Sequence, residues 1–561
     1  MSTHPAAVDL LHPTPQSRLD AGAIQQNLTF AFAAGGTGEA LKRILDEQTL
    51  APSTFAPESF GRDLFLSDFV RRCIPLNVPG GEEGLDYELL ERLLAAPPAD
   101  AAVVHFRHQV LRELLGNRAL RRSCESVWAQ VQGLRRRLET ADFGGPLDAV
   151  SRRVELLRAT KALLDELPGR FDGASSALAR LGAYAREVQG TDAYRHLEEL
   201  LEYEGHLATM EVRLRVGYDG RLRGCELVRA QDNTRSAFYR TRLSRLLTWL
   251  TGLLRGYRFR EAEVLAGMLD GVFDGVRDVV AAFLQIGCDL EFYLAALAFR
   301  DFAGSRGLEV CLPRFVAEVE RPVSQLGNLF NPFLLLEPEP PIPCDLTVPQ
   351  GALVIVSGPN SGGKTRLLQG YGLAQLLAQC GFFVPAEQAR LAWREGLFVS
   401  LVYGNSCDER EGRLGTELLR IRRLFEQSPL ESLVLLDELC AGTNPSEGEE
   451  LFELVVTLLS RLEPQALIST HFLEFAHRLQ RERSVDGLDF LQVELDEHLH
   501  PTYHFVPGVA STSLARQTAE RLGVTRDALL GLIEAKRKRR SRDSGPDDGG
   551  AGRDAAGSDE S

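Results

Sequence analysis

A glycine-rich stretch of eight residues carries the clearest chemical signal in the sequence. It reads Gly358-Pro-Asn-Ser-Gly-Gly-Lys364-Thr365 and matches the pattern G-x-x-x-x-G-K-[ST] of a phosphate-binding loop. Glycines let the backbone N–H groups approach phosphates closely, and the helix that follows adds its N-terminal dipole. We expect Lys364 to reach the β- and γ-phosphates of ATP and the Thr365 hydroxyl to bind Mg²⁺. The predicted nucleotide-binding residues are Gly358, Pro359, Asn360, Ser361, Gly362, Gly363, Lys364 and Thr365.

Two carboxylates follow an apolar run roughly 70 residues after this loop. The run is Leu433-Val-Leu-Leu, and Asp437 and Glu438 come directly after it. A buried strand would place both side chains at its end, beside the phosphate loop. We expect Asp437 to hold Mg²⁺, directly or through water. Glu438 would polarise the attacking water, either as a general base or by orienting it. These two residues complete the site of an ATPase.

A third polar site follows the run Ala466-Leu-Ile-Ser-Thr, which ends at His471. Histidines at strand ends are often structural, but here the residue follows the third apolar run of a series that ends in reactive groups. We expect His471 to contact the γ-phosphate or to hold the attacking water.

Short apolar runs bounded by Gly and Pro must position these groups. They alternate with helical stretches such as Arg366–Gln379, which is typical of a mostly parallel sheet buried on both faces. The predicted strands are Ala352–Val356, Leu397–Val402, Leu433–Leu436 and Ala466–Ile468.

A helical pattern dominates the chain from about Phe60 to Phe315. Leu157 and Leu164 belong to a stripe of apolar residues at three-, four- and seven-residue steps, and Arg and Glu lie between them. One interruption, with alternation over Val212–Val216 and again over Leu222–Val228, predicts a hairpin between helices. Helices resume at about Thr234. The sequence gives no assignment for residues 1–58.

The composition indicates which partners and which cellular compartment to expect. The net charge of −15 argues against a general affinity for nucleic acid, although it allows a local basic surface. No signal peptide and no apolar run of the ~20 residues that cross a bilayer are visible, so we expect no membrane contact. The nine cysteines are scattered without metal-ligand spacing, which is typical of reduced thiols in a cytoplasmic protein.

Four segments together resemble the ATPase domain of the MutS DNA mismatch-repair proteins. The Phe-Val-Pro-Ala end of the second segment and the D-E-x-x-x-G-T string of the third separate this family from transporters and kinases. The segments are Gly358–Thr365, Leu376–Ala386 (LLAQCGFFVPA), Asp437–Asn444 (DELCAGTN) and Ser469–Phe475 (STHFLEF). The resemblance extends to Asn328–Leu334, which looks like the approach to the ATPase domain, and to Phe505–Ser511, which begins the last similar segment. Weaker similarities lie at Gly217–Asp219 and Asp289–Phe299, which resemble the flanks of the family's DNA clamp.

The resemblance implies an α/β P-loop ATPase domain with a mostly parallel, ABC-ATPase-like sheet, preceded by a mainly α-helical core or lever domain. It further implies ATP and Mg²⁺ as cofactors, DNA as a partner and a homodimer. In such a dimer, Gly412 and Glu417 of the segment Gly412–Leu418 would contact the ATP of the partner subunit. The segment Ala515–Glu534 would fasten the dimer, with Leu522, Val524, Leu529, Leu532 and Ile533 as contacts.

The resulting domain plan has five parts. They are an unassigned segment 1–58, a helical core or lever domain 59–320 with a short or reduced clamp, the ATPase domain 328–510, a helical dimerisation element 511–535 and a basic, then acidic, disordered tail 536–561. No segment resembles the family's mismatch-reading domain or its nuclease domain, and the expected Ser-Thr-Phe start is missing at Gly412.

These observations favour a MutS-like ATPase of DNA mismatch repair or recombination that couples ATP to conformational change of helical levers on DNA, with structured or branched DNA as its partner. The alternative is a mechanical P-loop ATPase or protein-interaction switch that does not bind DNA mismatches. The arginine-dense stretches Arg135–Arg137 and Lys536–Arg540 favour the first reading and the acidic balance favours the second. A small-molecule P-loop kinase would need a substrate lid near the loop, where the sequence has helical levers.

Overall fold

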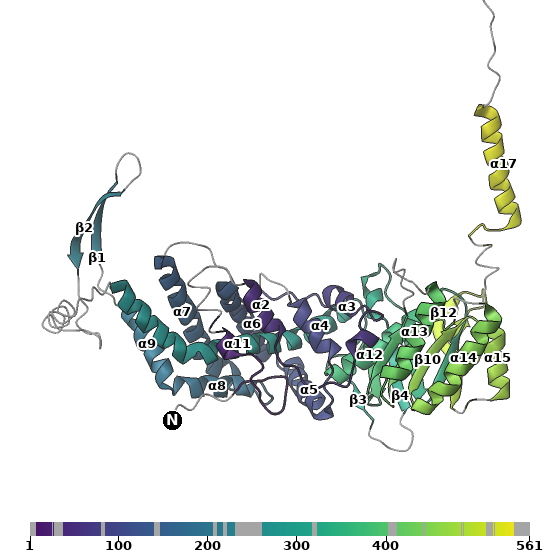
Figure 1. Ribbon diagram of the computed structural model, residues 1–561, viewed down its shortest axis with the longest axis horizontal. Helices are drawn as coiled ribbons and strands as arrows, with labels where there is room; N and C mark the ends of the chain where they lie inside the picture. Colours follow the sequence, from purple (N-terminus) through teal and green to yellow (C-terminus); the bar gives the residue numbers. More distant parts are fainter. Residues whose placement is uncertain are drawn as a thin grey trace, which may run out of the picture.

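Helices occupy one half of an elongated molecule and two β-sheets occupy the other (Figure 1). The computed structural model describes residues 7–24, 26, 38–79, 85–139, 146–205, 210–216, 222–230, 261–316, 323–401, 412–440, 444–483, 485, 487–511, 520 and 522–543.

The helical half confirms the helical pattern predicted from the apolar stripes. Leu157 and Leu164 are fully buried, as their spacing predicts. Asp86 and Asp100 cap the helices that follow them, because each carboxylate accepts a backbone N–H of the first turn. The helices are α2 (Gly38–Asp46), α3 (Leu66–Cys73), α4 (Tyr87–Ala95), α5 (Ala101–Gly116), α6 (Arg118–Glu139), α7 (Pro146–Phe171), α8 (Ala179–Gln189), α9 (Asp192–Gly205) and α11 (Glu261–Ser305), with a short 3₁₀ turn at Pro57–Ser59.

The longest helix, α11, runs through the middle of this half. Its part Gly275–Ser305 is long and apolar enough to cross a membrane, but 94% of that stretch is buried inside the protein. Its apolar residues face other helices, as in the central helix of a helical core.

The N-terminal segment, which the sequence left unassigned, packs into the helical half. Leu10 and Leu11 are fully buried. The Leu10 N–H donates to Asp289 Oδ2 of α11 at 2.8 Å, and Arg18 forms a buried ion pair with the same carboxylate. The helical domain therefore begins well before residue 59, and that predicted boundary is wrong. The cause is physical: a buried polar segment shows no periodicity, and its partners lie far along the chain.

The predicted hairpin is confirmed. Strands β1 (Met210–Val216) and β2 (Leu222–Ala230) pair antiparallel at the end of the molecule farthest from the large sheets (Figure 1). Gly217, Tyr218 and Asp219 lie outside the described residues, as does the part of the expected helix before Glu261.

The predicted parallel sheet is also confirmed. Five of its six strands are parallel, and the last one pairs antiparallel at the edge. In sheet order they are β12 (Pro501–Pro507), β11 (Leu488–Leu495), β6 (Leu353–Ser357), β10 (Gln465–Thr470), β9 (Leu433–Leu436) and β8 (Leu397–Ser400).

Helices cover both faces of this sheet. Alternate residues of β6 divide between two cores: Val354 and Val356 face the side of α12 (Lys364–Cys380), and Leu353 and Ile355 face the opposite side. On that opposite side lie α13 (Gly412–Gln427), α14 (Pro445–Leu459) and α15 (Leu473–Glu482), with a 3₁₀ turn at Ser460–Leu462. The sheet is buried on both faces, which its continuous apolar strands require.

A second sheet of four strands lies beside the first and was not predicted. Its order is β3 (Arg314–Phe315), β7 (Gln388–Leu391), β4 (Val323–Leu329) and β5 (Cys344–Pro349), and a 3₁₀ turn follows β4 at Pro332–Leu336. Gly327 and Asn328 interrupt the apolar pattern of β4, and for this reason the sequence did not predict the strand. The sheet-bearing half thus begins before the predicted boundary at residue 328.

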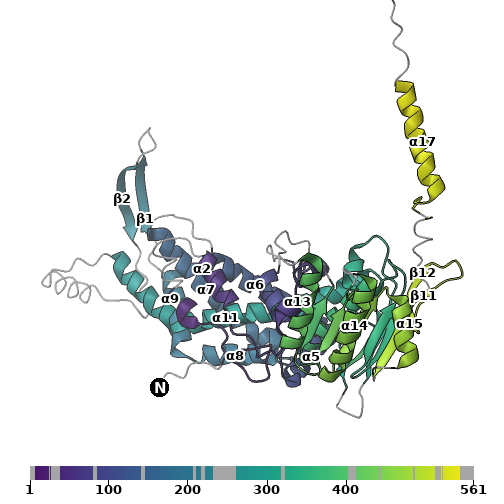
Figure 2. The same ribbon diagram turned by 45° about the vertical axis from the view of Figure 1, so that its right-hand side comes forward.

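The C-terminal helix α17 (Arg526–Asp543) stands away from the sheets in both views (Figures 1 and 2). It includes the basic run from Lys536, so the prediction of a disordered tail starting at 536 is wrong up to Asp543. Alanine, lysine and arginine favour a helix, and neither Gly nor Pro interrupts the chain between Leu532 and Asp543. Within the expected helix 515–534, a turn at Leu522–Thr525 with Gly523 at φ +68° precedes α17.

Candidate functional site

The phosphate loop connects strand β6 to helix α12, as the sequence predicts. Gly358 and Gly363 have φ of +147° and +87°, which glycine adopts without strain. A Cβ at Gly358 would lie 2.6 Å from Val493 Cγ2. Any other residue at Gly358 would therefore require movement of the neighbouring strand β11.

Lys364 lies inside the loop. Its Nζ donates to the carbonyl oxygens of Gly358 and Pro359, each at 3.0 Å. Burial lowers the pKa of Lys364, and the negative charges of Glu438 and Asp437 act in the opposite direction. A cation that donates to loop carbonyls at the cavity is suited to pair with an entering phosphate, which is a stronger acceptor than a carbonyl.

The carboxylates at the end of β9 meet the loop. The Thr365 hydroxyl donates to Asp437 Oδ2 at 2.6 Å. Ser469, at the end of β10, donates to Asp437 Oδ1 and accepts the Glu438 N–H at 2.9 Å. The structure thus brings Thr365, Asp437 and Glu438 together, although 72 residues separate Thr365 from Asp437 in the sequence.

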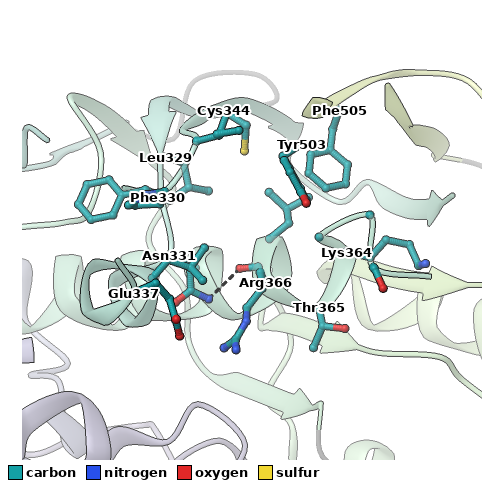
Figure 3. Close-up of a pocket in the computed structure, with 18 of the residues that line it drawn as sticks. Leu329, Phe330, Asn331, Glu337, Cys344, Lys364, Thr365, Arg366, Tyr503 and Phe505 are labelled. Carbon is teal, nitrogen blue, oxygen red and sulfur yellow. Dashed lines mark hydrogen bonds between the residues drawn. The ribbon is translucent and has the colours of Figure 1, made fainter. Parts of the chain in front are cut away.

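A cavity of about 570 Å³ opens over the loop. One wall consists of the loop and Glu438, and the other is largely apolar, with Phe330, Tyr503 and Phe505. Tyr503 and Phe505 project from β12 toward this space (Figure 3). An ATP molecule needs these two kinds of surface, one for its phosphates and one for its base.

Sequence reasoning missed the aromatic wall. A Cβ at Gly363 would lie 3.3 Å from Tyr503 Cδ1, so the tyrosine ring packs directly against the phosphate loop. Tyr503 has φ of +63°, a conformation that is rare for an aromatic residue. The one signal in the sequence was the spacing of Tyr503 and Phe505, which places both on one face of a strand.

The other predicted residues have different positions. His471 is exposed after β10, and its ring lies 4.4 Å from that of Phe472 without lining the cavity. Gly412 begins helix α13. Glu417 is buried, and its carboxylate accepts the N–H of Cys440 in its own chain. The contact of Glu417 with the ATP of a partner subunit stays a prediction, and within this chain the side chain points toward the turn that follows β9.

The residues present fit magnesium and a nucleotide. Thr365 and Asp437 supply a hydroxyl and a carboxylate, which are oxygen ligands of the kind that Mg²⁺ prefers. Gly362 and Gly363 line the cavity, and the 17-residue helix α12 begins at the next residue, so its N-terminus lies at the cavity. A phosphate loop between a parallel strand and a helix, with Asp-Glu at the end of the next strand but one in the same sheet, defines the P-loop ATPase domain.

Comparison with known families agrees with this class of domain and identifies a particular family within it. Residues 354–535 match the family model described as MutS domain V. Over these residues, about a third of the chain, it is similar to the MutS family.

Relatives match about a third of the chain. Endonuclease MutS2 of Thermus thermophilus is 36% identical over 178 residues, which are 32% of this chain and 24% of the relative. Endonuclease MutS2 of Caldanaerobacter subterraneus is 31% identical over 198 residues, which are 35% of this chain and 25% of the relative. The similarity thus spans about a quarter of the length of these relatives.

We predict that nucleotide binding depends on Lys364. Replacing Lys364 with Ala removes the cation, and Lys364→Arg places a guanidinium too broad for the loop. We expect ATP affinity to fall by about 10- to 100-fold in both variants. Calorimetric titration of ATP measures this, with Lys42→Ala as the control because Lys42 is exposed and pairs with Glu88. Unchanged affinity in both variants would refute the assignment of the loop.

Proposed function

We propose that this chain is a MutS-like ATPase that binds Mg-ATP and couples its hydrolysis to a change in the helical half, acting on DNA in mismatch repair or recombination. The observation that carries the proposal is that Lys364, Thr365 and Glu438 line one cavity, and that the Thr365 hydroxyl donates to Asp437. The match of residues 354–535 to MutS domain V supports the link to DNA repair.

Each residue would have a distinct task in hydrolysis. The loop N–H groups and Lys364 would bind and orient the phosphates. Thr365 and Asp437 would hold Mg²⁺, which when bound neutralises charge on the phosphates. Glu438 lines the cavity and would accept a proton from the attacking water or orient it. His471 remains a candidate for a γ-phosphate contact and would need to turn toward the cavity.

Helix α12 offers a physical connection between this site and the helical half. Its first residue is Lys364, and beyond its other end Phe382 packs on Phe292 and Phe299 of α11, with ring centroids 5.4 and 6.3 Å apart. Arg107 Nη1 of α5 donates to the Cys380 carbonyl oxygen at 2.7 Å. A shift of α12 on nucleotide binding would therefore move side chains that pack against the levers.

The proposed partners are DNA and a second copy of this chain. All five predicted contact residues before and on α17 are exposed: Leu522, Val524, Leu529, Leu532 and Ile533. Their exposure favours a contact with a second subunit over the alternative that they cover the sheet of their own domain. Leu529, Leu532 and Ile533 share one face of α17, which would pack against the other subunit.

A cytoplasmic setting is supported by the thiols. Seven cysteines of the described chain are free, and six of these are buried. Reduced thiols are typical of proteins that work in a reducing compartment.

We predict that Glu438→Gln separates binding from turnover. The amide keeps the size of the side chain but cannot accept a proton, so kcat should fall by about 10²–10⁴ while ATP still binds. Phosphate release and ATP titration measure the two quantities. The control is Glu426→Gln, since Glu426 is an exposed carboxylate that pairs with Arg422 on α13. Normal turnover of Glu438→Gln would exclude the role given to Glu438.

We predict that the protein binds branched DNA more tightly than plain or mismatched duplexes. Gel shifts at several salt concentrations measure this and give the number of phosphates contacted from the salt slope. If the basic run of α17 contacts phosphates, K536Q/R537Q should reduce that slope by about 2, and R481Q/R483Q, which changes exposed arginines of the ATPase half, should not. No shift with any DNA would favour the mechanical ATPase that lacks DNA binding.

We predict that apolar residues of α17 hold a dimer. Replacing Leu529, Leu532 and Ile533 together with Ser should yield a monomer, because burying each such side chain is worth about 1.5–3 kcal/mol. Turnover per chain should then depend on protein concentration. Sedimentation and ATPase assays across concentrations measure both, with Leu430→Ser, at an exposed leucine before β9, as the control. A wild-type protein that stays monomeric with ATP and hydrolyses at a constant specific rate would contradict the dimer.

A further inference from the structure

The turn that carries the two carboxylates has an unusual backbone. Glu438 and Cys440 have φ of +48° and +61°, in the left-handed region that side chains other than glycine rarely adopt. Such a conformation persists only when the surroundings hold it, and it is found more often at functional sites than elsewhere. The contacts that hold Asp437–Cys440 therefore bear on the position of both carboxylates.

Ser469 holds the first half of this turn. Its side chain is fully buried at the end of β10. The hydroxyl accepts the Glu438 N–H at 2.9 Å and donates its own hydrogen to Asp437 Oδ1. One hydroxyl thus connects the backbone of Glu438 with the carboxylate of Asp437.

This connection decides which carboxylate oxygen faces the phosphate loop. Because Oδ1 of Asp437 is held by Ser469, Oδ2 points to the Thr365 hydroxyl at 2.6 Å. Without Ser469 the carboxylate could rotate about its χ2 bond, which is soft. The Glu438 N–H would also lose its acceptor.

Glu417 of α13 holds the second half. Its carboxylate accepts the N–H of Cys440, and its side chain is buried between α13 and the turn. An acceptor that carries a charge makes a stronger hydrogen bond than a neutral one. Side chains from two neighbouring elements therefore hold a backbone conformation that the sequence Asp-Glu-Leu-Cys does not favour by itself.

We propose that Ser469 and Glu417 are positioning residues that hold Asp437 and Glu438 in the geometry required for hydrolysis. The proposal rests on the ATPase function proposed above and adds two residues that do not touch the nucleotide. Ser469 sets the orientation of the metal-binding carboxylate, and Glu417 fixes the backbone beyond Glu438. Glu417 thereby acts within its own chain.

A purely structural role predicts a different result from a positioning role. A buried serine whose hydrogen bond only stabilises the fold should lower the stability when it is replaced and leave kcat and the Mg²⁺ requirement unchanged. Ser432 offers such a case. It is equally buried, lies at the opposite end of β9, and donates to the Pro429 carbonyl oxygen at 2.7 Å.

The test compares Ser469→Ala, Ser469→Thr and Ser432→Ala in the full-length chain. For Ser469→Ala we expect kcat to fall about tenfold, because the loss of one hydrogen bond to a charged group has an effect of this size. The Mg²⁺ concentration for half-maximal rate should rise, and ATP affinity should stay within about twofold because the phosphate loop is intact. Ser469→Thr keeps the hydroxyl and should restore most of the rate, and Ser432→Ala should have wild-type kcat.

A second pair of variants tests Glu417 independently. Glu417→Gln keeps an oxygen that can accept the Cys440 N–H, and Glu417→Ala does not. We expect a larger loss of kcat in Glu417→Ala than in Glu417→Gln, with ATP affinity unchanged in both. This pair keeps the proposal testable if Ser469→Ala fails to fold.

The outcomes separate the two proposals. If the wild-type protein hydrolyses ATP and both Ser469→Ala and Glu417→Ala have its kcat and its Mg²⁺ requirement, the positioning role is overturned and the ATPase function stands. If Ser432→Ala loses as much kcat as Ser469→Ala, the effect is structural and the positioning role is again overturned. A wild-type protein that binds ATP but does not hydrolyse it would overturn the proposed function itself.

Discussion

The burial of helix α12 beyond its first turn is the constraint on which the rest of the structure depends. All residues from Leu367 to Cys380 are buried, so protein surrounds this helix on every side. A Cβ at Gly372 would lie 2.8 Å from Leu435 Cδ1, which shows how closely the sheet approaches. The polar side chains that remain must find partners inside the protein: Gln375 donates to the Ala392 carbonyl and Gln379 to that of Arg394. Because close packing surrounds it, this helix can move only as a rigid body.

The phosphate loop, the strands β6, β8, β9 and β10 and the helical half were predictable because each depends on local pattern. Glycine spacing, continuous apolar runs and a period of 3.6 residues are all visible within a short window of sequence. The same is true of the hairpin at the far end. For these elements, propensity and burial lead to the same structure.

The remaining features depend on contacts between distant segments. Asp9, His12 and Arg18 are buried, although residues of these polar types are usually exposed and the sequence alone would place them at the surface. Their burial is possible because Arg18 pairs with Asp289, which lies 271 residues further along the chain. Removing one partner of such a buried pair typically costs about 3–5 kcal/mol, so the N-terminal segment is bound firmly to α11. The inward direction of Glu417 and the aromatic wall of Tyr503 likewise depend on neighbours that no local pattern reveals.

The length of α11 has a mechanical consequence. Its 45 residues run without a break from the hairpin end of the molecule to the phenylalanines that pack beside the ATPase half. At a rise of 1.5 Å per residue the helix is about 68 Å long. A rotation of about 5° at the ATPase end would thus displace the opposite end by about 6 Å, which is slightly more than the pitch of an α-helix, about 5.4 Å. The aromatic contacts near Phe382 fix the direction of α11. A small change in that direction would therefore move the hairpin at the other end by several ångströms.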